Sequence, residues 1–491
     1  MDIRFKGASL QHYERTLNTA VSQEDTLETI VPDALPDVAE LLLTDGQSLI
    51  RGKDVHRSGV SVSGLSELNV LYRAEDGSIA RLPVDIPFET EISFNVPDDA
   101  SKIAASVRLT GGEARILNSR KLLLRAEVCI TLSVWSPVTL RWAEEATAEG
   151  CSVEIKTQRG TFRPVCAVEE KTFTVEDKLT LPAGKPQAAA LLYSRAALQP
   201  EEAEQVGHKL VARGTAEVTA LYRTGSDELA SADFRLPWSA FLELPEAEGE
   251  LSWELVTALT GCSGELTEDG AFSFTVGGVV QAAIRSEREL SWIADAYGTD
   301  CAFSPVFETA ELDGETETEL RMESVSLRLD SMERFRSIVS LSVCCGRPRA
   351  EKENLRISVS AKALCLTEDG SLEALAARGE CLCPGSGSMP EVFVGDVSAA
   401  IVPGGVELRC PLSFRQTRCR RSRLHFLSEA EVAEAGEKEK GPNVILLRTC
   451  EGDSVWSLGK KKGIACASIR SYNQLAEGEE PAPGSLLLLA R

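Results

Sequence analysis

Apolar side chains recur at every second position in long stretches of the chain, which is the period of a β-strand with one buried face. The first such run contains Leu122, Leu124, Ala126, Val128, Ile130, Leu132 and Val134, and a second spans residues 355–363. Asp76-Gly77 and Asp369-Gly370 lie between apolar runs and are typical of hairpin turns, because glycine accepts a positive φ. We therefore expect a mainly β protein of antiparallel sheets, packed as sandwiches or partly closed into barrels.

Several features of this pattern recur 150 residues further along the chain. The matching sets are Pro32 and Pro36 with Pro182 and Pro186, Leu71-Tyr72-Arg73 with Leu221-Tyr222-Arg223, Pro87-Phe88 with Pro237-Trp238, and Leu109-Thr110-Gly111 with Leu259-Thr260-Gly261. Four sets at one spacing indicate an internal repeat. Because proline cannot donate to a strand ladder, Pro87 and Pro237 belong at a strand end or a sheet edge.

A third, more divergent copy is indicated by two matches at a spacing of 293 residues. Glu368–Ser371 repeats Glu75–Ser78, and Leu364-Cys365-Leu366 stands where the first copy has Leu71-Tyr72-Arg73. We predict tandem repeated β domains at residues 1–146, 147–295 and 296–430, a linker at 431–443, and a C-terminal module at 444–491.

Short helices and connecting segments complete the prediction for the repeated part. Asp33–Leu43, with Pro36 near its start, is expected to be helical, and Pro200–Val206 is its expected counterpart. Residues 145–152 and the acidic segment Glu311–Glu319 are expected to link the copies. Ser428–Pro442 is rich in Glu, Ala and Lys, which predicts a solvated helix or a flexible tether. Gly277-Gly278 lies between apolar residues and indicates a β-bulge.

Residues 444–491 predict a small α+β module with the order strand, helix, helix, strand. The expected elements are a strand at Val444–Leu447, a helix at Val455–Lys462 capped by Asp453 or Ser454 and ended by Gly463, a helix at Ala467–Tyr472 ended by Asn473, a turn at Pro483-Gly484, and a strand at Ser485–Leu489. Short polar side chains before a helix accept hydrogen bonds from its first N–H groups, and glycine after it accepts the left-handed conformation.

This module resembles the LysM family, which has Gly-Asp-Ser/Thr-Leu-Trp after its first strand, Asn at the end of its second helix, and Pro-Gly before its last strand. The corresponding residues here are Gly452-Asp453-Ser454-Val455-Trp456, Tyr472-Asn473 and Pro483-Gly484. The resemblance implies binding of N-acetylglucosamine-containing glycans in a groove between the two loops. The binding residues would be Gly452, Asp453, Ser454, Val455, Trp456, Asn473 and Gly484. Gly478-Glu479-Glu480 adds negative charge to the second loop, so a protein ligand stays an equal alternative.

Trp456 has two interpretations. A small module needs large side chains in its core, and an exposed tryptophan can instead dominate a protein interface.

The repeated part resembles the SPOCS domain of spore-forming Firmicutes. Glu28–Val38, followed by the set that contains Gly64, Leu71-Tyr72 and Pro87-Phe88, carries this resemblance. With a C-terminal LysM module, the chain is similar to a family of spore-coat morphogenesis proteins. The family implies a cytosolic protein of the mother cell that lies at the forespore surface. It further implies docking to the stage IV sporulation protein A-like ATPase of the coat basement layer. The SPOCS domain brings no general set of catalytic residues with it.

The charge and the cysteines restrict the classes of partner and the compartment that we expect. The 491 residues carry a formal net charge of −23, and such an acidic surface repels phosphate backbones, so we expect no nucleic-acid partner. No apolar run is long enough for a membrane span. The first residues lack the apolar region of a secretory leader, so we expect a reducing compartment and 14 free cysteines, mostly buried as small hydrophobic side chains.

Motifs for catalysis, metal binding and cofactor binding are absent from the sequence. The four histidines are far apart, and Cys344-Cys345 and Cys381-x-Cys383 lack a second pair at zinc-finger spacing. The chain has no Gly-x-Ser-x-Gly, Walker or Gly-x-Gly-x-x-Gly motif. We therefore expect a non-enzymatic adaptor without metal or cofactor. Peptidoglycan binding is the alternative, and an enzyme acting on wall polymers is a weaker third hypothesis.

A basic cluster runs against the acidic net charge. It consists of Arg415, Arg418, Arg420, Arg421 and Arg423. It is either an exposed basic strand face or a docking patch for an acidic partner or an anionic membrane surface.

Overall fold

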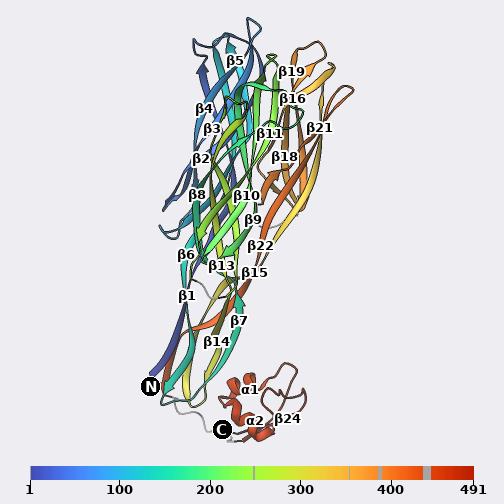
Figure 1. Cartoon of the computed structure of the whole chain (residues 1–491). Helices are drawn as coiled ribbons and strands as arrows, with labels where there is room; N and C mark the ends of the chain where they lie inside the picture. The colour runs from blue at the N-terminus through green and yellow to red at the C-terminus, as the bar shows by residue number, and fades with distance from the viewer. Residues whose placement is uncertain (1, 247–248, 353, 385–389, 435–443, 491) are drawn as a thin grey trace.

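The protein is an elongated stack of long antiparallel strands with two short helices at its C-terminus. The computed structural model describes residues 2–246, 249–352, 354–384, 390–434 and 444–490. Strands account for 76% and helices for 3% of the structure, so the expected mainly β class is confirmed. The molecule is narrow at the end that holds the N-terminus and the C-terminal helices, and it broadens toward the other end (Figure 1).

Long two-stranded ribbons run along the molecule. β1 (Asp2–Ile30) pairs with β6 (Lys121–Glu149), and β15 (Cys301–Asp330) pairs in the same way with β22 (Gly405–Glu434). The part of the chain between these two ribbons forms a third ribbon, which is split into two shorter pairs of strands. β7 (Val153–Phe162) pairs with β14 (Arg288–Gly298), and β8 (Val165–Leu179) pairs with β13 (Phe272–Ser286).

Each ribbon is extended by further strands at the broad end of the molecule. β5 (Lys102–Asn118) pairs with β6, and β12 (Leu251–Leu266) pairs with β13. β20 (Glu391–Val394) and β21 (Ser398–Val402) both pair with β22.

Three antiparallel sheets in the described part of the chain cover these ribbons. Their strands, each sheet in order, are β2 (Val38–His56), β3 (Gly59–Ala74) and β4 (Ile79–Ser93); β9 (Ala188–Val206), β10 (Lys209–Thr224) and β11 (Leu229–Glu243); β16 (Phe335–Cys345), β18 (Asn354–Thr367) and β19 (Leu372–Pro384), with β17 (Arg349–Glu351) also on β18.

The alternating apolar residues lie between sheet and ribbon. The seven apolar positions of residues 122–134 are all at most 1% exposed, as the period-two pattern predicts. Leu122, Leu124 and Ala126 of β6 pack against Tyr72 and the inner face of the first sheet. The second sheet packs on β13 and the third on β22 in the same way. Burial of these faces is the main source of stability for such a structure.

The three sheets meet each other through their opposite faces. Leu71, Leu221 and Leu364 share one buried cluster with residues from all three sheets. Asp45 lies beside this cluster and is 5% exposed. Its Oδ2 is 2.9 Å from Nε of Arg195, and its Oδ1 accepts a 2.8 Å hydrogen bond from Oγ of Ser342. A buried carboxylate needs such partners, because burial alone strongly disfavours the charged form.

The two helices expected in the repeated part are wrong. Residues 33–35 form a turn, and β2 begins at Val38, so Asp33–Leu43 is not helical. Pro200–Val206 belongs to β9 and pairs with β10. Strand pairing and the burial of Leu42 and Leu43 outweigh the local preference of these segments for helix.

The expected links lie mostly within strands where the structure describes them, and only residues 150–152 of the first one form a connection, between β6 and β7. β6 continues to Glu149, Glu311–Glu319 lies inside β15, and residues 428–434 belong to β22. The acidic content of these segments is compatible with strands because every second side chain of a half-buried strand faces water. Residues 435–443, which include most of the expected linker, lie outside the described residues. The predicted domain limits at 146, 295 and 430 fall within β6, β14 and β22, and the domain division stays a prediction.

The bulges and prolines follow the sequence pattern closely. Pro87 lies on β4 and Pro237 on β11, and both strands are sheet edges, as expected. The ladders of β5 and β12 each contain one extra residue at the equivalent threonines, Thr110 and Thr260. The bulge expected at Gly277-Gly278 is therefore present in this ladder, but its extra residue belongs to the partner strand β12.

Candidate binding module at the C-terminus

The C-terminal module has the element order that the sequence predicts. β23 (Val444–Arg448) pairs antiparallel with β24 (Leu486–Ala490), and α1 (Val455–Lys462) and α2 (Cys466–Asn473) lie between them in sequence. The buried cluster of the module consists of Val455, Leu458, Ile464, Ile469, Leu487 and Leu489. These side chains come from both helices, the turn between them and β24, so the module has a core of its own.

Ser454, rather than Asp453, caps α1. The Oγ of Ser454 accepts a 3.0 Å hydrogen bond from the Ser457 N–H, and the Oγ of Ser457 accepts a 2.8 Å bond from the Ser454 N–H. This reciprocal pair is a capping box. Asp453 instead accepts a 2.7 Å bond from the Cys450 N–H and closes the preceding turn. Gly463 ends the helix with φ 63°, as predicted.

Asn473 stabilises the edge of β24. Its Oδ1 accepts a 2.6 Å hydrogen bond from the Leu488 N–H, and its Nδ2 donates 2.8 Å bonds to the carbonyls of Leu488 and Ile469. The side chain thus replaces a missing strand partner. Its hydrogen bonds are committed to the fold of the module rather than to a ligand.

A carboxylate of the chain bridges the two loops of the expected groove. Oε2 of Glu480 accepts a 2.6 Å hydrogen bond from the Val455 N–H, and Oε1 lies 3.4 Å from the Arg470 guanidinium. Arg470 also donates to the carbonyls of Ala476 and Glu479 in the second loop. Negative charge is favourable at a helix N-terminus, where N–H groups have no intrahelical partner. The sequence predicted that Glu480 adds negative charge to the second loop, but not that it joins this loop to the start of α1.

Gly452 and Gly484, the other two expected groove residues, are at exposed loop tips. Their φ angles are 89° and 83°, and a Cβ at either position would have no atom within 4 Å. Glycine is required here by the backbone conformation and not by a close neighbour.

Trp456 lies outside the core of the module and packs against β14. Its Nε1 donates a 2.8 Å hydrogen bond to Oδ2 of Asp295, and its ring meets that of Tyr297 edge-on at 5.0 Å. Lys460 completes the contact, with Nζ 2.5 Å from Oδ1 of Asp295. Burial opposes ionisation of Asp295, but hydrogen bonds from Lys460 and Trp456 outweigh it and lower the pKa of that carboxyl. Trp456 is therefore neither in the core of the module nor an anchor for another molecule in this structure, because it contacts β14 of the same chain.

Tyr297 forms the second half of this contact. Its hydroxyl donates a 2.9 Å hydrogen bond to the Ile464 carbonyl and lies 3.3 Å from Sγ of Cys466. Burial raises the pKa of the Tyr297 hydroxyl, so it remains protonated and able to donate. A Cβ on Gly459 would lie 2.3 Å from the Tyr297 hydroxyl oxygen, so glycine permits this close approach. The sequence analysis did not identify Asp295, Tyr297 or Gly459 as contact residues. The available signal was Gly459, because a glycine inside a helical segment often marks a close contact.

Comparison with protein-family models, curated proteins and solved structures finds no match. The resemblances to the SPOCS domain and the LysM module therefore rest on the sequence motifs. Among the described residues, neither helix could cross a membrane, since each has 8 residues.

The basic cluster on β22 faces the acidic segment of β15. Arg418 lies 3.6 Å from Glu319, Arg421 3.4 Å from Asp313, and Arg423 3.4 Å from Glu311. Arg415 donates to the Pro200 carbonyl at 2.7 Å and covers the ring of Phe393. These contacts favour the interpretation as a basic strand face, because much of its charge is compensated within the ribbon. The acidic segment expected to be a link is thus the partner of the basic one.

Proposed function

We propose that the protein is a non-enzymatic structural adaptor, in which three copies of one β domain form an elongated body and the LysM-type module engages a partner protein. Equivalent contacts support the repeat. The Tyr72 hydroxyl donates a 2.9 Å hydrogen bond to the Pro36 carbonyl, and Tyr222 donates a 3.0 Å bond to Pro186. Both pairs are separated by 36 residues, and the tyrosines are 150 residues apart.

The strand registers support inclusion of the third copy. Asp45 is opposite Asn69, Arg195 is opposite Thr219, and Ser342 is opposite Lys362. Asn69, Thr219 and Lys362 lie on the middle strands β3, β10 and β18. Thr219 is 150 residues and Lys362 is 293 residues after Asn69, the same spacings as in the sequence repeat. Leu71, Leu221 and Leu364, which have these spacings too, pack together.

The state of the groove is the observation that favours a protein partner over a glycan. Glu480 bridges the two loops through the Val455 N–H, whereas the outer face of the β23–β24 sheet carries exposed apolar side chains. Val444 is 55%, Leu446 64% and Leu486 61% exposed within the described structure. Exposed apolar side chains that share one face of a sheet suit a protein interface. The family resemblance implies which protein this partner is: a stage IV sporulation protein A-like ATPase at the forespore surface, in the mother-cell cytoplasm.

Peptidoglycan binding is the second candidate. The open tips at Gly452 and Gly484 favour it, because a glycan could reach both loops without displacing a neighbouring side chain there. The bridge from Glu480 to the Val455 N–H would have to open first.

The proposal contains no catalytic step, and it gives no nucleophilic role to the buried thiols of Cys345 and Cys365. Burial raises the pKa of Cys345 to about 12 and that of Cys365 to about 11. A thiol of that kind is a poor nucleophile, because the thiolate is the reactive form.

Binding of the full-length protein to the purified basement-layer ATPase and to insoluble peptidoglycan sacculi, at two salt concentrations, tests the proposal. We expect binding to the ATPase, and we expect Leu446→Glu to weaken it at least about tenfold, as loss of an interface hot spot does. Glu477→Gln, an exposed change in the second loop, is the matched control. Binding to sacculi without binding to the ATPase would favour the second candidate and overturn the first.

A further inference from the structure

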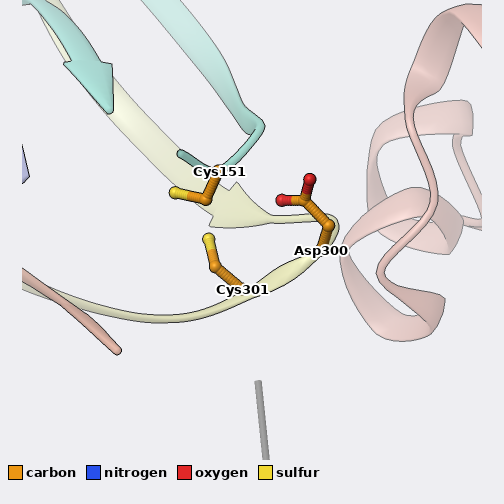
Figure 2. Close-up of side chains that lie close together, drawn as sticks. All are labelled: Cys151, Asp300 and Cys301. Carbon is orange, nitrogen blue, oxygen red and sulfur yellow. The ribbon is translucent and has the colours of Figure 1, made fainter. Parts of the chain in front are cut away.

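Two thiols and a carboxylate from separate segments lie together at the narrow end of the molecule. Cys151 is in the connection between β6 and β7, Asp300 is in the connection between β14 and β15, and Cys301 is the first residue of β15. The two Sγ atoms and one carboxylate oxygen all lie within 4.8 Å of one another. Figure 2 shows the three side chains together. We propose that these three residues bind a soft divalent cation, with zinc as the expected ion.

The backbone around the cluster holds the two connections together. The Thr299 N–H donates a 2.9 Å hydrogen bond to the Ser152 carbonyl. The Ser152 N–H in turn donates a 2.6 Å bond to Oδ1 of Asp300. This second bond fixes the orientation of the carboxylate beside the two thiols. Hydrogen bonds of this kind to a ligand orient it and strengthen metal binding.

Close packing places the thiol of Cys301. A Cβ on Gly298 would lie 2.8 Å from Sγ and from the carbonyl oxygen of Cys301. Glycine at this position therefore leaves the room in which the thiol lies. Cys301 is 5% exposed, Cys151 is half-buried and Asp300 is exposed, so a cation can enter from the side of the carboxylate.

The donor set determines the type of ion. Two thiolates and one carboxylate are ligands for zinc, whereas calcium and magnesium take oxygen ligands. Neighbouring ligand atoms of a tetrahedral zinc site are roughly 3.6–3.8 Å apart, from Zn–S and Zn–O distances of about 2.3 and 2.1 Å. The observed cluster needs to contract by about 1 Å at most to reach this geometry. Three protein ligands leave a fourth position for water or for a donor from another molecule.

Cys151 lies near the start of the second predicted copy, residues 147–295, and Cys301 lies near the start of the third, residues 296–430. One ion would then fasten the start of the second copy to the start of the third. It would also fix the end of β14, on which Asp295 and Tyr297 hold the C-terminal module. The site stands independently of the proposed function, because its geometry does not depend on what the module binds.

Metal titration of the full-length protein tests this site. The protein is reduced, stripped of metal and titrated with Co²⁺, and Zn²⁺ affinity is measured by competition with a chromophoric chelator. We expect one ion per chain, with the thiolate charge-transfer absorption and the intense visible bands of tetrahedral Co²⁺. Metal binding without thiolate absorption, or no metal binding at all, would overturn the proposal.

Variants assign the ion to these residues among the 14 cysteines of the chain. Cys151→Ser is expected to reduce zinc affinity by more than the roughly 10–100-fold that loss of an outer hydrogen-bond partner costs. Asp300→Asn keeps the shape of an exposed side chain and is expected to weaken binding while the protein stays folded. Cys450→Ser, at an exposed thiol outside the cluster, is the matched control and should bind as the unmodified protein does.

Two results would reject the assignment. One is unchanged thiolate absorption and affinity in both Cys151→Ser and Asp300→Asn. The other is a Cys151–Cys301 disulfide, found by mass spectrometry in protein purified without reductant, together with failure to bind metal after reduction.

Discussion

The indole N–H of Trp456 donates a 2.8 Å hydrogen bond to the carboxylate of Asp295, a residue 161 positions earlier in the chain. The contact joins the first helix of the C-terminal module to β14. It includes the Lys460–Asp295 ion pair and the hydrogen bond from Tyr297 to the Ile464 carbonyl. The module is therefore docked on the β body in this structure, despite the tether that the sequence predicts before it.

Trp456→Ala is expected to loosen this contact while the core of the module stays intact. Trp456 lies outside the buried cluster of the module, so its removal leaves that cluster complete. Loss of about 1–2 kcal/mol of docking energy would raise hydrogen exchange in β14 by roughly 5–30-fold. Hydrogen-exchange mass spectrometry of residues 292–298 measures this. Tyr472→Ala, at an exposed ring of α2, is the control, and equal exchange in both variants would contradict the docking role.

Gly459→Ala is expected to destabilise the protein by about 1–3 kcal/mol, the usual cost of overpacking. Alanine in a helix interior would otherwise stabilise by up to about 1 kcal/mol relative to glycine. The new methyl group would lie 2.8 Å from the carbonyl oxygen of Ile464 and 2.3 Å from the hydroxyl oxygen of Tyr297, so it would overlap both. Urea unfolding of the single and double variants separates the two contacts: the cost should be smaller in a Tyr297→Ala background. An equal cost in both backgrounds would mean that Tyr297 does not constrain Gly459.

Glu480→Gln is expected to weaken the module by about 0.5–1 kcal/mol, through the lost charge at the start of α1 and the lost pair with Arg470. Thermal unfolding measures this loss, with Glu477→Gln as the control in the same loop. If the groove is not a glycan site, sacculus binding should not increase in the variant. A gain of sacculus binding would instead identify Glu480 as the group that closes a glycan groove.

Glu391 is expected to make stability depend on pH near neutrality. One of its carboxylate oxygens is buried and has no hydrogen-bond partner among the described residues. Burial raises the pKa of Glu391 from 4.5 to about 7, against the opposing effect of Arg415. Because the folded pKa is the higher one, stability is lost as the pH rises from 4.5 to about 7, and the loss levels off above that.

Glu391→Gln checks this dependence. The variant should be less sensitive to pH across this window and more stable than the unmodified protein at pH 8, by on the order of 1–3 kcal/mol. Chemical unfolding at several pH values measures it. Parallel pH profiles for the two proteins would show that another group is responsible.

Period-two patterning and turn residues were sufficient to predict the mainly β class, the buried face of residues 122–134, the edge prolines and the whole order of the C-terminal module. They failed at Asp33–Leu43 and Pro200–Val206, where pairing with a distant strand decides the conformation. The acidic segment at 311–319 failed for the same reason, since its partner arginines lie about a hundred residues later. Local preference carries no information about such partners.

The candidate sites divide in the same way. The capping role of Ser454 and the left-handed Gly463 depend on neighbours in sequence and were predictable. The contacts of Trp456 with Asp295 and of Glu480 with Val455 depend on how separate segments pack. Cys151 and Cys301 were visible in the sequence, but their proximity depends on how the β6–β7 and β14–β15 connections pack together.

The meeting of Asp45, Arg195 and Ser342 has a consequence for how the body can be assembled. Three identical domains around this point would bring three like charges, or none, into a buried place. Here the charges of Asp45 and Arg195 compensate each other, and Ser342 donates a hydrogen bond to the same carboxylate. If the three sheets belong to copies of one domain, as we propose, each copy supplies a different part of this contact. Removal of the copy with Arg195 would then leave the buried Asp45 without its counter-ion, so the copies would depend on one another as the unlike subunits of a trimer do.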